Sequence, residues 1–197
     1  IPGNRCNGVT ETFAEIDGLP NFSCIDPDEI EEAIKKLLAF NREEVAGIVG
    51  RAGDDPTWDS LVAPLEEIDD RLTKAWVPIS HLNAVVNTDA LRAAHDGCLV
   101  ALTQYSTELG QSQPLYDAYK NLQSGKTYDN ELSAAQKKVL DNALIDFELS
   151  GVGLDKQSKK RFADISERLA VLASEFQNNV LDASDAWTRH FDSPDSL

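Results

Sequence analysis

Apolar residues recur at steps of three and four along most of the chain, the spacing that places them on one face of an α-helix. The first clear case follows Asp26 and Pro27, a pair typical of a helix N-terminus, and ends at Gly50 and Gly53. We therefore expect a first helix between these residues. Its apolar face consists of Ile30, Ile34, Leu37, Val45 and Ile48.

A second helix is predicted to begin at Asp55-Pro56-Thr57. Its apolar positions follow a pattern close to a heptad repeat, which is typical of helices that pack almost antiparallel. Pro64 falls in the first turns, whereas Pro78 is expected to kink or end the helix. The apolar positions are Leu61, Leu65, Ile68, Leu72, Trp76, Ile79 and Leu82.

The same periodicity predicts four more helices. They cover residues 88–110, 114–122 and 133–149, and a last stretch of about thirty residues that begins near Asp155. This last helix has one apolar stripe, which we expect to pack inward, and a charged face, which we expect to be solvated. The stripe consists of Phe162, Ile165, Leu169, Leu172, Phe176 and Val180.

The pattern therefore predicts an all-α fold, an antiparallel bundle of about six long helices. Residues 1–25 lack a period and are expected to form an irregular N-terminal arm, and residues 26–186 one helical domain. Residues 187–197 carry Trp187 and Phe191 beside a polar end, and we expect them to be a stub that leads toward a further domain.

The composition narrows the range of partners. The formal net charge of −16 disfavours binding to nucleic acid and to anionic membranes, and no apolar run is long enough to span a bilayer. We expect neither nucleic acid nor membrane as a partner. Three cysteines without tight spacing favour reduced thiols over a disulfide framework, and Cys98 falls on an apolar helix face, where a buried thiol is expected.

No pattern of catalytic or metal-ligating residues is complete. His81, His95 and His190 have no second histidine four residues away, as a zinc-binding H-E-x-x-H helix requires, and no glutamate three residues before them, as a di-iron bundle requires. The segment Gly125-Lys126-Thr127 lacks the first glycine of a phosphate-binding loop. We therefore predict no catalytic, cofactor-binding or metal-binding residue in this chain.

Five segments, taken in order, resemble the N-terminal region of the thimet-oligopeptidase family of zinc metallopeptidases. They are residues 55–65 (DPTWDSLVAPL), 78–85 (PISHLNAV), 134–143 (AAQKKVLDNA), 146–154 (DFELSGVGL) and 175–183 (EFQNNVLDA). The resemblance extends over residues 20–190. It is the shared order of the five segments, rather than any one of them, that makes it specific.

The resemblance implies a non-catalytic domain of a cytoplasmic metalloendopeptidase that hydrolyses short peptides. The implied partner is the catalytic domain of the same polypeptide, which holds the zinc ion, and the N-terminal region helps to wall the substrate channel. Ser80, His81 and Asn83 lie where a helix is expected to end, and we predict them as residues of the channel wall. The alternative is a stand-alone, acidic helical module that binds another protein.

Overall fold

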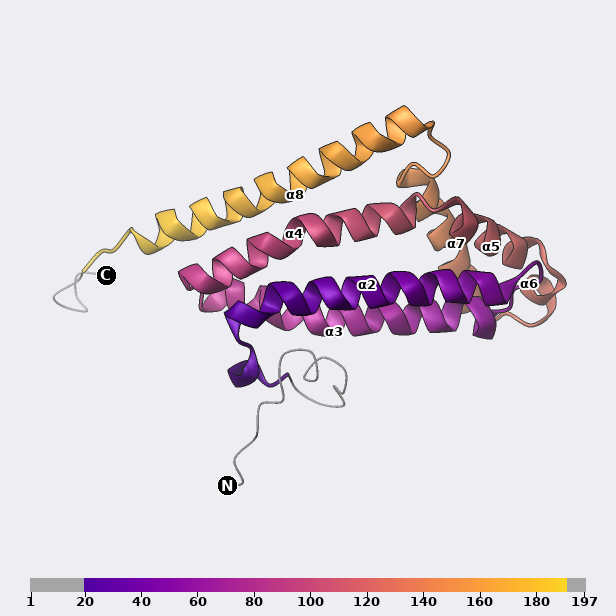
Figure 1. Cartoon of the computed structure of the whole chain (residues 1–197), viewed down its shortest axis with the longest axis horizontal. Coiled ribbons are helices and arrows are strands. Elements are labelled where there is room, and N and C mark those ends of the chain that lie inside the picture. Colours follow the sequence, from indigo (N-terminus) through magenta and orange to yellow (C-terminus); the bar gives the residue numbers. More distant parts are fainter. Residues whose placement is uncertain (1–19, 191–197) are drawn as a thin grey trace, which may run out of the picture.

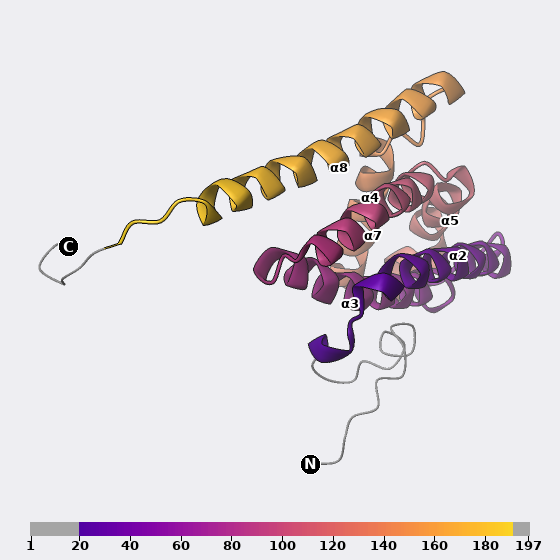
Figure 2. The same cartoon turned by 60° about the vertical axis from the view of Figure 1, so that its left-hand side comes forward.

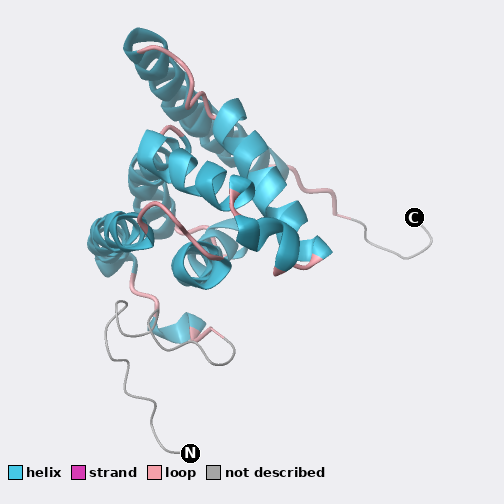
Figure 3. Cartoon of the chain, turned by 90° about the vertical axis from the view of Figure 1, so that its right-hand side faces the viewer, coloured by secondary structure: helices cyan, strands magenta, loops and turns pink. Residues whose placement is uncertain are grey.

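The computed structural model describes residues 20–190, and all regular elements in that range are helices (Figures 1 and 3). The predicted all-α class is confirmed, and a short helix, α6, brings the α-helices of the described part to seven. The elements are the 3₁₀ turn η1 (Phe22–Cys24), α2 (Pro27–Ala52), the π-helical turn η2 (Trp58–Val62), α3 (Ala63–Val85), α4 (Asp89–Gly110), α5 (Gln113–Ser124), α6 (Lys126–Asn130), α7 (Ala134–Leu149) and α8 (Lys156–Asp185).

Polar side chains fix the starts of the long helices. Asp26 accepts a hydrogen bond from the backbone N–H of Asp28, the second residue of α2, and Thr88 accepts one from that of Leu91, the third residue of α4. Ser133 and Gln136 form a reciprocal capping box at the start of α7. Asp155 accepts from two backbone N–H groups of α8, and these hydrogen bonds lower the pKa of its carboxyl group.

The second predicted helix differs from the expectation in two places. Its first turn is the π-helical segment η2, and α3 proper begins at Ala63, with Pro64 in its first turn. Pro78 does not end the helix, because α3 continues to Val85. Pro78 is buried together with Ala75 and Ile79, so the packing of this turn offsets the backbone hydrogen bond that proline cannot donate.

The buried apolar residues form two clusters at opposite ends of α2. The first lies where the C-terminal half of α2 meets η2, α5 and α7, and it contains Leu61, Leu122 and Leu140, all fully buried. The second lies where the N-terminal half of α2 packs against α3 and α4, and it contains Ile34 and Ile79. α2 therefore joins both clusters, and α3 runs beside it (Figure 1).

Helix α8 contacts the bundle along α4 and extends as a rod beside it (Figures 1 and 2). Ser174 is its one buried residue, and neither apolar cluster contains a residue of α8. The expectation that its apolar stripe packs inward is therefore wrong for five of its six residues. Phe162 is half-buried, whereas Ile165, Leu169, Leu172, Phe176 and Val180 are 42–69% exposed. The side chains of α8 that hydrogen-bond α4 are instead polar ones, namely Glu167, Ser174, Asn178 and Asp182.

Cys98 is 1% exposed, as its place on the apolar face predicted, and burial raises the pKa of its thiol to about 11. Cys24 is disulfide-bonded, so the expectation of reduced thiols is wrong for this residue. Cysteine spacing alone does not reveal such a bond, because a disulfide depends on which residues the fold brings together. Among the described helices, none is long and apolar enough to cross a membrane.

Candidate functional site

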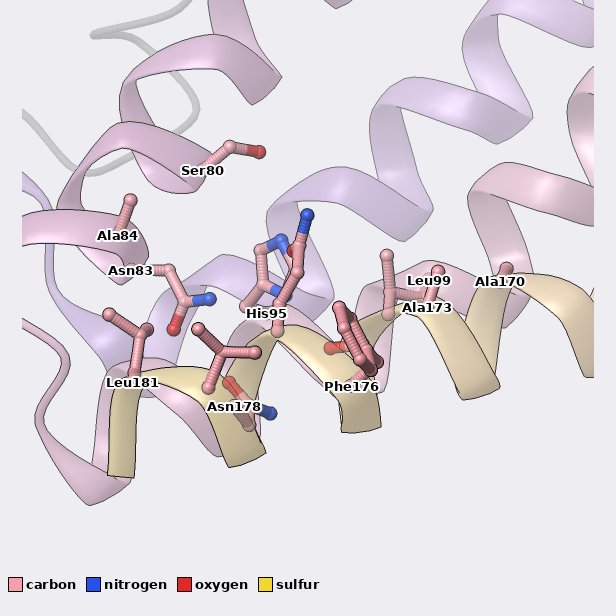
Figure 4. A pocket seen from close by; sticks show the side chains of 13 residues that line it. Ser80, Asn83, Ala84, His95, Leu99, Ala170, Ala173, Phe176, Asn178 and Leu181 are labelled. Atoms are coloured by element: carbon pink, nitrogen blue, oxygen red, sulfur yellow. The ribbon is translucent and has the colours of Figure 1, made fainter. Parts of the chain in front are cut away.

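A groove of about 720 Å³ lies between α8 and the facing ends of α3 and α4 (Figure 4). Two kinds of surface form it: a polar wall that includes Ser80, Asn83 and His95, and an apolar wall on α8 that includes Ala173 and Phe176 (Figure 4). Apolar grooves with a few polar groups are typical of sites that bind extended or small ligands. This groove is the candidate functional site.

Asp96 connects the two sides of the groove. Its carboxylate accepts a hydrogen bond of 2.6 Å from the Ser174 hydroxyl and one of 3.4 Å from the Asn178 amide, both on α8. Nδ1 of His95 lies 3.3 Å from the same carboxylate. The serine hydroxyl therefore bonds the carboxylate and not the imidazole, so these residues are not arranged as an activated serine nucleophile.

The ring of His95 is held by packing. It is 8% exposed and stacks on Trp76 with ring centroids 4.8 Å apart. Trp76 lies on α3, so this stack joins α3 to α4 beside the groove. The imidazole consequently has a fixed orientation in the groove wall, which is the role that we assign to it.

A second polar contact joins the start of α4 to the end of α8. We call the line of contact between these two helices the seam. The Arg92 guanidinium donates two hydrogen bonds to the Asp182 carboxylate, of 3.0 and 2.7 Å, and a third to the Asn87 side chain. Gln104 and Glu167 form a further bond across the seam, of 3.1 Å. α8 is thus attached to α4 mainly by hydrogen bonds and one ion pair.

We expect the Arg92–Asp182 contact to make the attachment of α8 depend on pH. The hydrogen bond from Arg92 lowers the pKa of Asp182 below its usual 3.8, so the stabilisation is present above about pH 4 and is lost as the pH falls through the lowered pKa. Arg92→Ala removes the contact at all pH values. At pH 7 we expect the backbone amides in the C-terminal half of α8 to exchange about two- to five-fold faster in this variant than in the unchanged protein, once both rates are corrected for intrinsic exchange.

Lys160→Ala is the matched control for this prediction. It removes an ion pair with Asp164 that lies within α8 and does not reach α4. If the amides of α8 exchange equally fast in the two variants, Arg92 does not hold α8 to α4. The same follows if α8 of the unchanged protein is as protected in acid as at pH 7.

The structure places two of the three predicted wall residues at the groove. Ser80 and Asn83 line it, and the backbone carbonyl of Asn83 accepts a 2.6 Å hydrogen bond from the side-chain amide of Asn87. His81 lies outside the groove, is exposed, and contacts the ring of Phe22 at 5.7 Å between centroids. Sequence reasoning missed Asp96 and Ser174, because residues 78 positions apart carry no local signal of their contact.

Between residues 20 and 190, no group of three or more His, Cys, Asp or Glu side chains is placed to hold a metal ion. Some acidic side chains of this part form ion pairs along one helix, as Glu31 does with Lys35 on α2, and others bond a neighbouring helix, as Asp182 does. The groove itself offers one imidazole as a metal ligand, together with uncharged amides and hydroxyls.

Comparison with known proteins agrees with these features. Residues 33–159 match the model of the N-terminal domain of neurolysin and thimet oligopeptidase. The chain is also similar to oligopeptidase A of Salmonella typhimurium, with 46% identity over 171 residues, which is 87% of this chain and 25% of that protein. The sequence of the chain is thus similar to that of a peptidase N-terminal domain.

Two proteins of Arabidopsis thaliana are further relatives. An organellar oligopeptidase A of chloroplasts and mitochondria is 34% identical over 84% of this chain and 20% of its own length. A probable cytosolic oligopeptidase A is 33% identical over 84% of this chain and 23% of its own length. The chain belongs to the neurolysin/thimet oligopeptidase family and corresponds to its N-terminal domain. It spans about a quarter of the length of the curated relatives that it matches.

Proposed function

We propose that this chain is the non-catalytic front part of an oligopeptidase A-like zinc metalloendopeptidase, and that its groove contributes to the wall of the substrate channel. The family match and the similarity to oligopeptidase A carry the first half of the proposal. The groove between α8 and α3–α4 supports the second half, since it is open, mainly apolar and bordered by the polar groups of Ser80 and Asn83.

A wall of this kind acts by exclusion. An extended peptide can lie along apolar side chains and exchange hydrogen bonds with a hydroxyl and an amide, whereas a folded protein must first unfold to enter. Substrates of the whole enzyme are therefore proposed to be short peptides. The zinc ion that activates water belongs, in this proposal, to the catalytic domain of the same polypeptide, outside the residues of this chain.

We propose a cytoplasmic location, as the name of the cytosolic plant relative suggests. The similarity to an organellar relative and the disulfide at Cys24 are the two observations that favour another compartment. Fractionation of cells, with titration of thiols in the recovered protein, decides between them. Recovery of the protein in the cytoplasmic fraction is the expected result.

The channel proposal is tested by filling the groove. In the full-length protein, Ser80→Phe is expected to lower kcat/KM about tenfold for long peptides and to change it little for the shortest ones, because bulk in a wall hinders long substrates most. Ser106→Phe, an exposed serine on α4 that does not line the groove, is the matched control. The measurement is hydrolysis of one peptide series that increases in length.

A length profile that Ser80→Phe leaves unchanged would remove the groove from the channel. Asn83→Leu tests the same wall through its polar group. His81→Ala decides whether the wall continues past the groove to the exposed side chain beside Phe22.

A further inference from the structure

Five large apolar side chains of α8 form a continuous exposed stripe. They recur at steps of three and four and are 42–69% exposed, so that one face of the helix is apolar over about four turns. Exposed apolar surface of this extent marks a contact with another protein surface. The α8 stripe consists of Ile165, Leu169, Leu172, Phe176 and Val180.

Ile165, Leu169 and Leu172 of the α8 stripe lie on the side of α8 away from the bundle, whereas Phe176 and Val180 lie at the edge of the stripe that borders the groove. Ser174, the buried residue of α8, bonds Asp96 of α4 and so marks the side that faces the bundle. Leu172 and Phe176 are two positions before and after it, about 200° around the helix. A helix that closes its own domain turns its apolar face inward, and α8 does the opposite. Phe176 and Val180 also border the groove, so groove and stripe meet along one edge of α8.

The limits of the family domain agree with this orientation. The match to the N-terminal domain ends at residue 159, which is in the first turn of α8, and both apolar clusters of the bundle lie entirely before α8. The bundle is therefore complete without α8. These observations favour a domain boundary in the turn formed by residues 150–155, whereas the hydrophobic pattern predicts one near residue 186.

We propose that α8 is the first helix of the next domain, and that the polypeptide following it in the full-length protein packs on the α8 stripe through an apolar surface of its own. The inference rests on the proposed function for the existence of that polypeptide. The relatives indicate the size of that polypeptide, because about three quarters of the length of oligopeptidase A lies outside the region that matches this chain. A second copy of this chain is a poorer occupant, because each copy has a formal net charge of −16 and two copies repel one another.

The test compares amide exchange of α8 in the full-length protein and in residues 1–197 alone. We expect α8 to exchange at least about tenfold more slowly in the full-length protein, since burying one apolar side chain changes an opening equilibrium by about that factor. Ile165→Gln is expected to remove this difference. The matched control is Ile145→Gln on α7, because Ile145 and Ile165 are 50% and 49% exposed and both lie inside helices.

Equal exchange of α8 in the two proteins, or equal effects of Ile165→Gln and Ile145→Gln in the full-length protein, would overturn the proposal. Sedimentation of residues 1–197 provides a second measurement. A dimer that Ile165→Gln dissociates, combined with an unprotected α8 in the full-length protein, identifies a second copy as the occupant and also overturns the proposal. Peptide hydrolysis is measured separately, so a protected α8 in a protein without peptidase activity supports this inference while refuting the proposed function.

Discussion

Leu122→Ala is expected to lower the free energy of unfolding by about 2–5 kcal/mol, which is a large part of the about 5–15 kcal/mol that stabilises a typical domain. Leu122 is fully buried in the first apolar cluster, where α5 meets α7 and the C-terminal half of α2. Alanine buries less apolar surface than leucine, so the variant loses part of the free energy of burial. It also leaves a cavity, because closely packed helices do not collapse to fill the space. Unfolding in urea, followed by circular dichroism, measures the change through the shift of the midpoint.

Leu149→Ala is the control for this result. It makes the same chemical change at the end of α7, where the leucine is 72% exposed, so a change within about 0.5 kcal/mol is expected. If the two variants shift the urea midpoint equally, the first cluster is not the stabilising core that the burial of Leu122 indicates.

The second large effect is expected from Gly151→Val, which should destabilise the protein by about 2–4 kcal/mol. Gly151 has a φ of +83°, and the backbone N–H groups of Gly151 and Val152 donate to the carbonyls of Glu148 and Phe147, the pattern of a Schellman motif. A β-branched residue is strained in this conformation. Its Cβ would also lie 2.6 Å from Cδ1 of Leu154.

Gly153→Val is the matched control, two residues further along the same turn. A Cβ at Gly153 has no neighbour within 4 Å, and its φ lies outside the positive range. The expected loss is below about 1 kcal/mol. Thermal unfolding of both variants measures the difference, and equal losses would show that the turn tolerates a side chain at Gly151.

The sequence predicted most of the helices because their ends depend on local chemistry. Asp26, Ser133 and Asp155 cap the helices that they were expected to begin, and Gly110 ends α4 as expected. A side chain that bonds a backbone N–H two or three residues ahead needs no distant partner, so its effect is visible in a short window of sequence. The same reasoning did not foresee η2 or the continuation of α3 through Pro78, because tertiary packing decides both.

The candidate site was less predictable than the fold. Ser80 and Asn83 were expected near a channel wall, and they border the groove, but the residues of α8 opposite them were expected in a core. A period of 3.6 shows that a helix has an apolar face and does not show which partner covers it. Asp96 illustrates the same limit, because it is bound by residues of a helix about eighty positions away.

The polar seam between α4 and α8 has a mechanical consequence. Apolar packing is lost when two helices slide by a fraction of a turn, because interlocked side chains fit in one arrangement. Hydrogen bonds such as those of Arg92, Asp96 and Gln104 can instead pass to water and form again at small cost. We therefore expect the seam to be a compliant joint, at which α8 tilts relative to α4 while the bundle keeps its shape, so that the width of the groove follows that tilt.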